Sequence, residues 1–489
     1  MYFILKEVFL ILAFKTIFYI SFIVNLAIIF IMILFDKKRP EKTLAWILIL
    51  MILPPVGLIL FIFLGRNWKV NTLDKKSKER TLRLISSTDL KENNLIYEYK
   101  DIISLVAANS FSPLFMNNEI KILDGGINKF DMLKKMLNEA TDHIHLEYYI
   151  VKNDGIGNEI KNILIKKANE GVKVRFIIDK VGSIRLNRKY IKDLRNAGVE
   201  VALYSYVLAP FLRLINTQIN YRNHRKIVVI DSKVGFLGGI NIGDEYIGLG
   251  KMGEWKDCHI MIEGDCVLGL QSVFLDDFSS IKKYNNEEVH ILNNIESYFK
   301  NHNSYGNVPM QIIKSGPDSE FPSILQVLIK MISTAKKSIN IITPYFIPSE
   351  SLMDSLKIAI LSGVIVSLIF PEKADHFTVN RASKTYLAEL QKIGAKIYFY
   401  KKNAFIHSKL LTIDEKICTI GTANLDIRSF ELNYEINSII YNEQITKDFN
   451  NLFKSLLENC SDFNYKQYEN RSTLNKLVDG VSRLLSSIL

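Results

Sequence analysis

Cysteine is scarce in this sequence and forms no recognisable pattern. The 489 residues include four cysteines, with no C-x-x-C pair and no spacing typical of zinc ligands: Cys258, Cys266, Cys418 and Cys460. This argues against a cysteine-based zinc site and against the disulfide framework of small secreted domains. Four thiols could still form two bridges, but a reducing compartment fits the pattern best.

Acidic residues are outnumbered by basic ones. The chain has 51 Asp and Glu against 62 Lys and Arg, a net charge of +11. Such a balance favours anionic partners, either phospholipid surfaces or nucleic acid, although scattered lysines often do no more than face solvent. The basic residues show no RNA-binding signature. The length exceeds what one hydrophobic core usually organises, so we expect two domains with additional segments.

Two long apolar runs lie near the N-terminus. Residues 17–35 are apolar except for Ser21 and Asn25, and residues 44–64 form a second run. A helix of the first length reaches across most of a bilayer core. The run is too long for a signal peptide and has no small-residue cleavage pattern, so we predict a retained anchor that makes the protein integral to the cell membrane.

The second run contains Pro54-Pro55. Prolines remove backbone donors, so we predict a helix break there, which would let the segment enter and leave the membrane on one face. Positive charge on both flanks of this run leaves its orientation open.

The rest of the chain repeats one plan. Residues 1–65 hold the membrane segments, and the polar residues 66–117 are interpreted as a linker near the membrane surface. Residues 118–300 and 301–489 then show the same succession of strand-like and helical stretches. Alternation of this kind predicts two α/β domains with largely buried sheets.

Each half closes with the same motif. The first is His224-x-Lys226-x4-Asp231, and the second is His407-x-Lys409-x4-Asp414. After six intervening residues come Gly238-x-x-Asn241 and Gly421-x-x-Asn424. The chain has eight histidines, so two such matched copies by chance are improbable.

The spacing has a direct chemical meaning. Side chains at i and i+2 of a strand share a face, which places each histidine beside its own lysine. A histidine can attack phosphorus or relay a proton, and a lysine can hold a phosphoryl oxygen. Asp231 and Asp414 fall on the other face. They could order the neighbouring turn or orient a histidine of the opposite half. The glycines would permit tight turns that return Asn241 and Asn424 toward the site.

This pattern resembles the phospholipase D superfamily, whose members place two such HKD motifs around a pseudo-twofold axis. Longer segments are similar to bacterial cardiolipin synthases: Asn220-Tyr-Arg-Asn-His-Arg-Lys-Ile-Val-Val-Ile-Asp231, Gly238-Gly-Ile-Asn-Ile-Gly-Asp-Glu-Tyr246, Trp255-Lys-Asp257 and Gly421-Thr-Ala-Asn-Leu-Asp-Ile-Arg-Ser-Phe-Glu-Leu-Asn433. The likeness extends over essentially the whole chain. Lys256 and Phe278 depart from the residues usual in that family, outside the motifs.

The resemblance implies two phospholipase D-like α/β domains in pseudo-twofold arrangement behind a membrane anchor. It also implies reversible ping-pong phosphatidyl transfer between two phosphatidylglycerol molecules, giving cardiolipin and glycerol. His224 would form the phosphohistidine, and His407 would act as general acid and then base. Glu435 is a possible histidine partner by the same likeness. No cofactor or metal is expected, and the expected partners are anionic membrane lipids rather than nucleic acid.

Three alternatives stay open at this point. The two histidines could serve a membrane-bound hydrolase or a nuclease, and a scaffold that lost its chemistry would keep the fold. His143, His145 and Glu147 alternate on a strand as metal ligands do, but a structural role is favoured because no fourth ligand is evident. The apolar positions within residues 474–489 would pack against the second half or contact the membrane surface.

Overall fold

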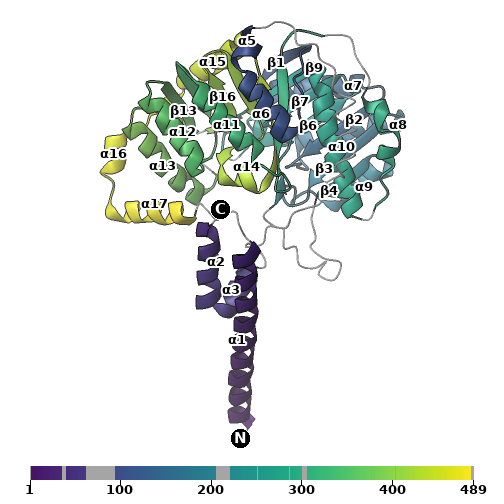
Figure 1. Cartoon of the computed structure of the whole chain (residues 1–489). Coiled ribbons are helices and arrows are strands. Elements are labelled where there is room, and N and C mark those ends of the chain that lie inside the picture. The colour runs from purple at the N-terminus through teal and green to yellow at the C-terminus, as the bar shows by residue number, and fades with distance from the viewer. Residues whose placement is uncertain are drawn as a thin grey trace. The chain divides into compact units, whose positions relative to one another are not determined.

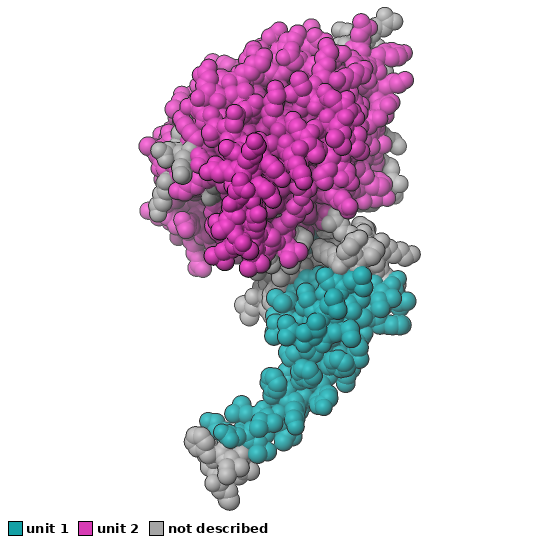
Figure 2. All heavy atoms as spheres, turned by 90° about the vertical axis from the view of Figure 1, so that its left-hand side faces the viewer, with its two compact units in different colours: residues 1–70, 206–221 teal, residues 71–205, 222–489 magenta. Residues whose placement is uncertain are grey.

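The computed structural model describes residues 2–35, 40–61, 94–204, 221–250, 252–285, 287–299, 305–373, 375–401 and 404–485. It divides into two compact units, which Figure 2 colours separately. One comprises residues 1–70 and 206–221, and the other comprises residues 71–205 and 222–489. Apart from residues 206–221, both halves of the predicted repeat belong to the second unit, so they share one compact body.

The described part of the first unit contains three helices, α1 (Tyr2–Phe35), α2 (Pro40–Ile52) and α3 (Pro54–Leu60). Helix α1 begins earlier than the predicted residue 17. Its segment Lys6–Leu34 is the one stretch of the described chain that is long and apolar enough to cross a membrane. At ~1.5 Å per residue it extends about 44 Å, more than the ~30 Å of a hydrocarbon core.

The predicted break in the second run is present, and α1 compensates for it. Helix α2 ends at Ile52 and α3 begins at Pro54. Proline has no N–H for the carbonyl of Leu50, four residues earlier. Asn25 of α1 donates its amide to that carbonyl (2.8 Å) and to the carbonyl of Pro54 (2.9 Å). The polar residue in the first apolar run therefore satisfies backbone groups that the break leaves exposed.

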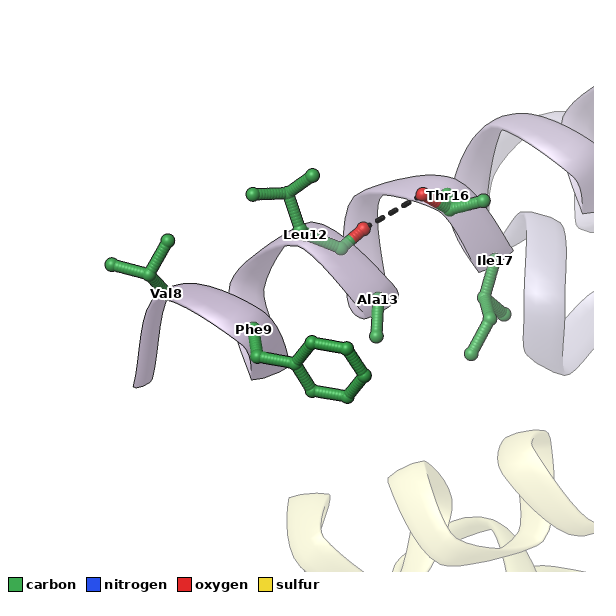
Figure 3. A pocket seen from close by; sticks show the side chains of 6 residues that line it. All are labelled: Val8, Phe9, Leu12, Ala13, Thr16 and Ile17. Carbon is green, nitrogen blue, oxygen red and sulfur yellow. Dashed lines mark hydrogen bonds between the residues drawn. The ribbon is translucent and has the colours of Figure 1, made fainter. Parts of the chain in front are cut away.

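A hollow along α1 is almost entirely apolar. Figure 3 shows the side chains that line it: Val8, Phe9, Leu12, Ala13, Thr16 and Ile17. The one hydroxyl, of Thr16, donates to the carbonyl of Leu12 in its own helix at 2.8 Å. This surface presents no unsatisfied polar group, as contact with lipid chains requires.

The second unit contains two large sheets with equivalent strand orders. Figure 1 labels every strand of the first, and β13 and β16 of the second. The first runs β1-β9-β7-β6-β2-β3-β4 and the second runs β10-β19-β17-β16-β11-β13-β14, with β20 added at its edge. Strands β2, β3 and β4 of the first sheet are parallel to one another, and so are β11, β13 and β14 of the second. The other neighbouring strands of both sheets pair antiparallel. The duplication predicted from the sequence therefore extends to strand order and direction.

The bounds of the strands in the first sheet are β1 Asn118–Asp124, β2 His143–Tyr148, β3 Lys173–Asp179, β4 Glu200–Tyr204, β6 Ile227–Ile230, β7 Val234–Gly238 and β9 Cys258–Gly264. Those of the second are β10 Met310–Ser315, β11 Ser338–Ile342, β13 Ile365–Pro371, β14 Lys396–Tyr400, β16 Leu410–Ile413, β17 Ile417–Gly421, β19 Asn433–Ile440 and β20 Cys460–Asp462. Five short strands complete the unit: β5 Arg222–Asn223, β8 Glu254–Lys256, β12 Phe346–Ile347, β15 Ala404–Ile406 and β18 Leu425–Asp426.

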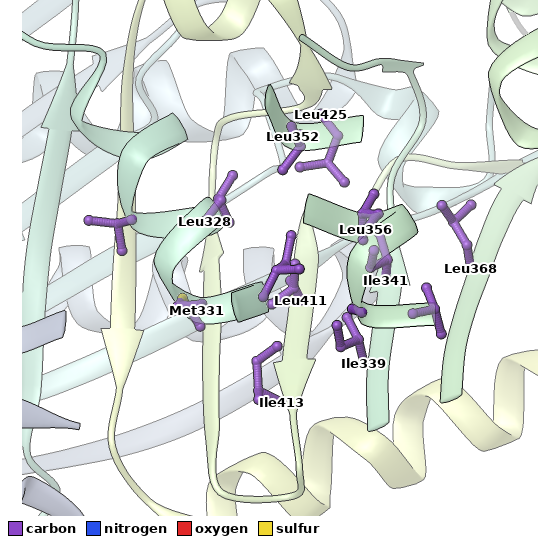
Figure 4. Close-up of a cluster of buried hydrophobic side chains, with 14 of the residues drawn as sticks. Leu328, Met331, Ile339, Ile341, Leu352, Leu356, Leu368, Leu411, Ile413 and Leu425 are labelled. Atoms are coloured by element: carbon purple, nitrogen blue, oxygen red, sulfur yellow. The ribbon is translucent and has the colours of Figure 1, made fainter. Parts of the chain in front are cut away.

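Helices cover both sheets, and their buried faces form three cores. One core joins the first sheet to α7 (Gly125–Glu139), α8 (Gly155–Asn169) and α9 (Arg188–Asn196). Another joins the second sheet to α11 (Ser323–Thr334), α12 (Glu350–Leu361) and α13 (Phe377–Lys392); Figure 4 shows part of it. The third contains side chains from both sheets and from α10 (Cys266–Tyr284) and α15 (Glu443–Leu457). This shared core fixes one half against the other.

The predicted linker is wrong for its C-terminal part. Residues 94–110 form α5 (Asn94–Glu98) and α6 (Lys100–Ser110), and Ile102 and Val106 are fully buried in the core of the second half. Apolar residues at helical spacing explain this, since burying each one contributes ~1.5–3 kcal/mol. Residues 66–93 of the predicted linker lie outside the described residues.

The C-terminal helices are α16 (Tyr465–Glu469) and α17 (Thr473–Leu485). Helix α17 packs on α13, and its buried Asp479 pairs with Arg381 and Arg471. The opposite face exposes a row of apolar side chains: Leu474, Leu477, Val481 and Leu484. Packing against the second half is therefore present, and the exposed row leaves membrane contact open.

Candidate active site

A cavity of about 500 Å³ lies between the two halves of the second unit. Both motif histidines line it, together with Asn241 and Asn424. The remaining lining residues come from loops and strand ends of both halves: Tyr149, Ile150, Val181, Arg222, Tyr246, Trp255, Tyr345, Ile347, Asp375, His376, Val379, Asp426, Ile427, Arg428 and Asn433. The structure thus brings the two predicted motifs to one site.

Two short strand pairs place the histidines, and each pair joins opposite halves. Strand β5, just before His224, is parallel to the start of β19, and the N–H of His224 donates to the carbonyl of Tyr434 at 3.0 Å. Strand β15, just before His407, is parallel to β8, and the N–H of His407 donates to the carbonyl of Lys256 at 2.7 Å. Each histidine therefore follows directly after a short parallel strand pair that joins the two halves.

This register gives each histidine a carboxylate from the other half. Continuing the two ladders by one residue sets His224 beside Glu435 and His407 beside Asp257. Nδ1 of His224 lies 3.0 Å from the Glu435 carboxylate, and Nδ1 of His407 lies 2.6 Å from Asp257. A carboxylate at Nδ1 fixes the ring tautomer and leaves Nε2 for the reaction. Glu435 is the partner that the resemblance suggested, whereas Asp257 lies in the similar segment Trp255-Lys-Asp257 without an assigned role.

The first pair favours an unprotonated imidazole. Burial, together with the charges of Lys226 and Lys409, lowers the pKa of His224 to about 4, although Glu435 opposes the shift. Burial alone would raise the pKa of Glu435, but the charges of His224 and Lys226 lower it below its ordinary value. Glu435 also accepts from the Thr422 hydroxyl at 2.6 Å and the Asn433 amide at 3.1 Å. At neutral pH this pair is a neutral imidazole held by a carboxylate.

The pair of His407 and Asp257 differs from the first pair in the pKa of its carboxyl group. Burial raises the pKa of Asp257 to about 7, against the opposing charge of Lys409. Burial and the charge of Lys409 hold the pKa of His407 well below its ordinary value. The carboxylate form of Asp257 and the imidazolium form of His407 are both disfavoured, so near neutral pH the pair can carry one shared proton. The two copies of the motif are therefore not electrostatically equivalent.

The lysines lie behind the histidines, although neither His224–Lys226 nor His407–Lys409 is on a strand, because β6 begins at Ile227 and β16 at Leu410. Nζ of Lys226 donates to the carbonyl of His224 at 2.7 Å, and Nζ of Lys409 lies 2.8 Å from Nδ1 of His407. Burial lowers the pKa of Lys226 to about 7 and that of Lys409 to about 8, and the charge of Lys409 adds to the shift at Lys226. Their positive charge depends on pH and on an anion in the cavity, so it is not a fixed charge.

The structure does not bring Asp231 and Asp414 to the cavity, and their place among the catalytic residues is corrected. Both begin three-residue hairpin loops, with φ of 53° and 54°. The Asp231 carboxylate accepts the N–H groups of residues 141, 142 and 143 at 2.8–2.9 Å, and Asp414 accepts those of 336, 337 and 338 at 2.7–2.8 Å. Of the two roles left open, they order the turn, because each occupies the far end of its strand from the histidine.

The Gly-x-x-Asn segments that follow the two motifs also reach the cavity, because their glycines let the backbone pass close to neighbouring residues. A Cβ on Gly238 would lie 2.5 Å from the His259 ring, and one on Gly421 would lie 2.3 Å from the Asn437 amide. Asn241 uses its amide to tie the loop, donating to the Tyr246 hydroxyl at 2.7 Å and accepting from residue 150 at 3.2 Å. Tyr246 stacks edge-on near His407, with ring centroids 6.0 Å apart.

The histidine-rich face of β2 is structural. His143 and His145 both contact the amide of Gln271, and Arg175 contacts His145 at 3.2 Å. Glu147 bonds to the Asn223 side chain, next to the first motif. Within the described part of the chain, no group of three His, Cys, Asp or Glu side chains is placed to hold a metal ion.

Sequence reasoning missed the residues that shape the cavity between the motifs. Arg222 and Asp375 carry no spacing signal, and only the fold places them beside the histidines. Of two tyrosines near the ends of the central strands, Tyr148 is buried in the first core and Tyr345 lines the cavity.

Comparison with known proteins decides the family. The family model described as "Cardiolipin synthase, PLD-like domain" matches residues 133–251 and 328–457, and a phospholipase D-nuclease N-terminal model matches residues 23–66. The major cardiolipin synthase ClsA of Bacillus subtilis is 40% identical over 480 residues, covering 96% of this chain and 98% of that protein. The chain belongs to the cardiolipin synthase family.

Other members of the cardiolipin synthase family match as fully. A cardiolipin synthase of Staphylococcus aureus is 40% identical over 487 residues, covering 97% of each chain. The crystal structure of a Haemophilus influenzae phosphatidylserine synthase has a TM-score of 0.60 at 13% identity, covering 81% of this chain and all of that one, which supports the fold alone. The predictions of a phospholipase D fold, a phosphatidyltransferase and a membrane-associated protein are confirmed.

Proposed function

We propose that this protein is a cardiolipin synthase that moves a phosphatidyl group from one phosphatidylglycerol to another and releases glycerol. The observation that carries the proposal is the pair of cross-half histidine–carboxylate contacts around one cavity. Splitting one displacement into two needs a nucleophile and a proton carrier on either side of the phosphorus. Two histidines, each held at Nδ1, supply both.

In the first step, Nε2 of His224 attacks the phosphorus of phosphatidylglycerol. The N–P bond forms as the P–O bond to glycerol breaks, and His407 gives its proton to the departing oxygen. In the second step, the hydroxyl of another phosphatidylglycerol gives its proton to His407 and its oxygen displaces His224. Lys226, Lys409 and the two asparagines supply the positive field and hydrogen bonds for the phosphoryl oxygens.

Two asymmetries support His224 as the nucleophile. Its pKa of about 4 keeps the lone pair free at neutral pH, beside an ionised Glu435 that stabilises the positive phosphoimidazole. The His407–Asp257 pair can hold one proton near pH 7, as a general acid requires. The sequence motifs are identical in these positions and do not make this distinction.

A labelled-lipid assay tests the activity. Purified protein with phosphatidylglycerol should yield cardiolipin and glycerol in equal amounts, and His224→Ala or His407→Ala should abolish both. Phosphatidic acid as the sole lipid product would indicate a hydrolase instead. Cleavage of nucleic acid without lipid turnover would indicate a nuclease, and unimpaired cardiolipin production by both alanine variants would refute the site.

A good leaving group tests the roles of the two histidines. Phosphatidyl-p-nitrophenol needs no acid to release nitrophenolate, so His407→Ala should still give a burst of about one nitrophenolate per enzyme. His224→Ala should give none. The opposite result would exchange the two roles.

We also propose that α1 anchors the enzyme by spanning the cell membrane, with its charged residues outside the hydrocarbon. Tags placed after residues 39 and 69 test the second segment: equal accessibility from one side supports re-entry at the proline break, and opposite accessibility supports a second span.

A further inference from the structure

The catalytic cavity has a cationic wall on one side only. Arg222 precedes His224 by two residues on β5 and is 8% exposed, and Arg428 lies in α14 (Ile427–Glu431), four residues after Asn424. Both line the cavity. Burial and the charge of Arg222 lower the pKa of Arg428, which indicates that the two guanidinium groups are close to one another. We name these two residues the arginine wall.

The second motif has no equivalent of the arginine wall. Phe405 precedes His407 by two residues, and Glu245 lies four residues after Asn241. The Phe405 ring packs against Trp255 with centroids 4.7 Å apart, and Glu245 pairs with Lys152 at 2.7 Å. The two halves share every residue of the motifs, so this difference serves something other than the chemistry common to both.

The cavity's two carboxylates each accept a hydrogen bond from the protein, and the charges of Asp426 and Arg428 also act on one another. Asp375 accepts from the Tyr345 hydroxyl at 2.8 and 2.7 Å, and its charge acts on His407. Asp426 caps α14 through the N–H of Ser429 at 2.6 Å, and burial raises its pKa. The cavity is therefore polarised, with the arginine wall as its cationic part. Planar guanidinium groups bind phosphate with two parallel N–H donors.

We propose that the arginine wall binds the second phosphodiester of the lipid pair, the phosphate of the acceptor lipid that is not attacked. This rests on the proposed function, because only transfer between two phospholipids brings two phosphates into one cavity, a glycerol apart. Lys226 and Lys409 stand behind the histidines and serve the attacked phosphate. Arg222 and Arg428 serve its neighbour, and so select an anionic lipid alcohol over a neutral one.

A partition assay tests this in a single vessel. Phosphatidylglycerol is incubated with labelled free glycerol, so that the phosphatidyl-enzyme divides between two acceptors. Transfer to glycerol returns labelled phosphatidylglycerol and involves one phosphate, whereas transfer to a second lipid gives cardiolipin and involves two. The ratio of the two products does not depend on how much enzyme is active or folded.

Arg428→Gln and Arg222→Gln should each lower the ratio of cardiolipin to labelled phosphatidylglycerol by about tenfold or more, as expected for the loss of one charge-assisted hydrogen bond. Arg428→Lys should restore part of it. Arg188→Gln on the exposed face of α9 is the matched control and should keep the wild-type ratio. An unchanged ratio in both arginine variants, whether total turnover falls or not, would overturn the proposal. A wild-type enzyme that forms no cardiolipin would instead overturn the proposed function.

Discussion

Replacing Glu435 with glutamine should slow catalysis far more than it weakens the fold. The side chain keeps its shape, but the carboxylate that accepts from Nδ1 of His224 at 3.0 Å becomes a neutral amide. The amide can donate as well as accept, so it no longer fixes the tautomer that leaves Nε2 unprotonated. The intermediate also loses a negative charge beside a positive phosphoimidazole.

The size of this effect can be bounded in two ways. A pair of unit charges 4 Å apart interacts by ~4 kcal/mol at an effective dielectric constant of 20. Measured hydrogen bonds to charged groups contribute ~1.5–3 kcal/mol, because removing the charge also removes its desolvation cost. The second range is the relevant one for a carboxylate as fully buried as Glu435. It corresponds to a loss of about 10- to 150-fold in rate.

Single-turnover formation of the phosphatidyl-enzyme, quenched in denaturant, measures the affected step. Glu435→Gln should form it about a hundredfold more slowly, with an unfolding midpoint close to that of the wild type. Asp257→Asn is the matched variant on the other histidine, and it should spare the burst from phosphatidyl-p-nitrophenol that Glu435→Gln slows. A rate for Glu435→Gln within twofold of the wild type would refute the assigned role of this carboxylate.

Four further predictions concern charge and stability. First, kcat/KM should rise with pH as His224 loses its proton near 4 and fall as Lys226 loses its proton near 7; Lys226→Arg should extend the alkaline side, and an unmoved alkaline limb would exclude Lys226 as its source. Second, Asp231→Asn should lower the free energy of unfolding by about 2 kcal/mol, measured in urea, with little change in turnover of the folded enzyme. The pKa of Asp231 is lowered in the fold, so its stabilisation is present at neutral pH and disappears in acid, and the variant should lack that acid-side loss. Third, Glu415→Gly should raise stability by about 0.5–1 kcal/mol, because Glu415 has φ of 59° and glycine removes the left-handed strain; a destabilised variant would contradict this. Fourth, Lys129→Met should stabilise by about 1–3 kcal/mol, because this fully buried amine has no hydrogen-bond partner among the described residues; calorimetry showing a lower Tm would count against the reasoning.

Local rules carried the sequence prediction a long way. Lys226 and Lys409 lie next to their histidines, as the i, i+2 rule suggested, although residues 224–226 and 407–409 precede strands β6 and β16. Asp231 and Asp414 follow these strands and lie in turns, away from the histidines. Pro54 predicted the helix break. These features depend on a few neighbouring residues, so the sequence contains the information directly.

Features that depend on packing of distant segments were beyond such rules. The partner of His407 is Asp257, 150 residues earlier, and only the pairing of β15 with β8 brings them together. Residues 94–110 fell within the range interpreted as a linker, yet the apolar side of α6 packs into a core built from the second half. The two motifs also have the same residues in different surroundings, and burial and neighbouring charges set the pKa values of their side chains.

Strands β5 and β15 each pair with a strand of the opposite half, and this has a consequence for any attempt to divide the molecule. A fragment ending between the halves would carry His224 and Asp257 but lack Glu435, and its complement would carry His407 and Glu435 but lack Asp257. Neither piece contains a matched histidine–carboxylate pair. Two separately made fragments should therefore be inert alone and recover activity only by complementing one another, and a single-copy relative built on this plan would need a twofold dimer to work.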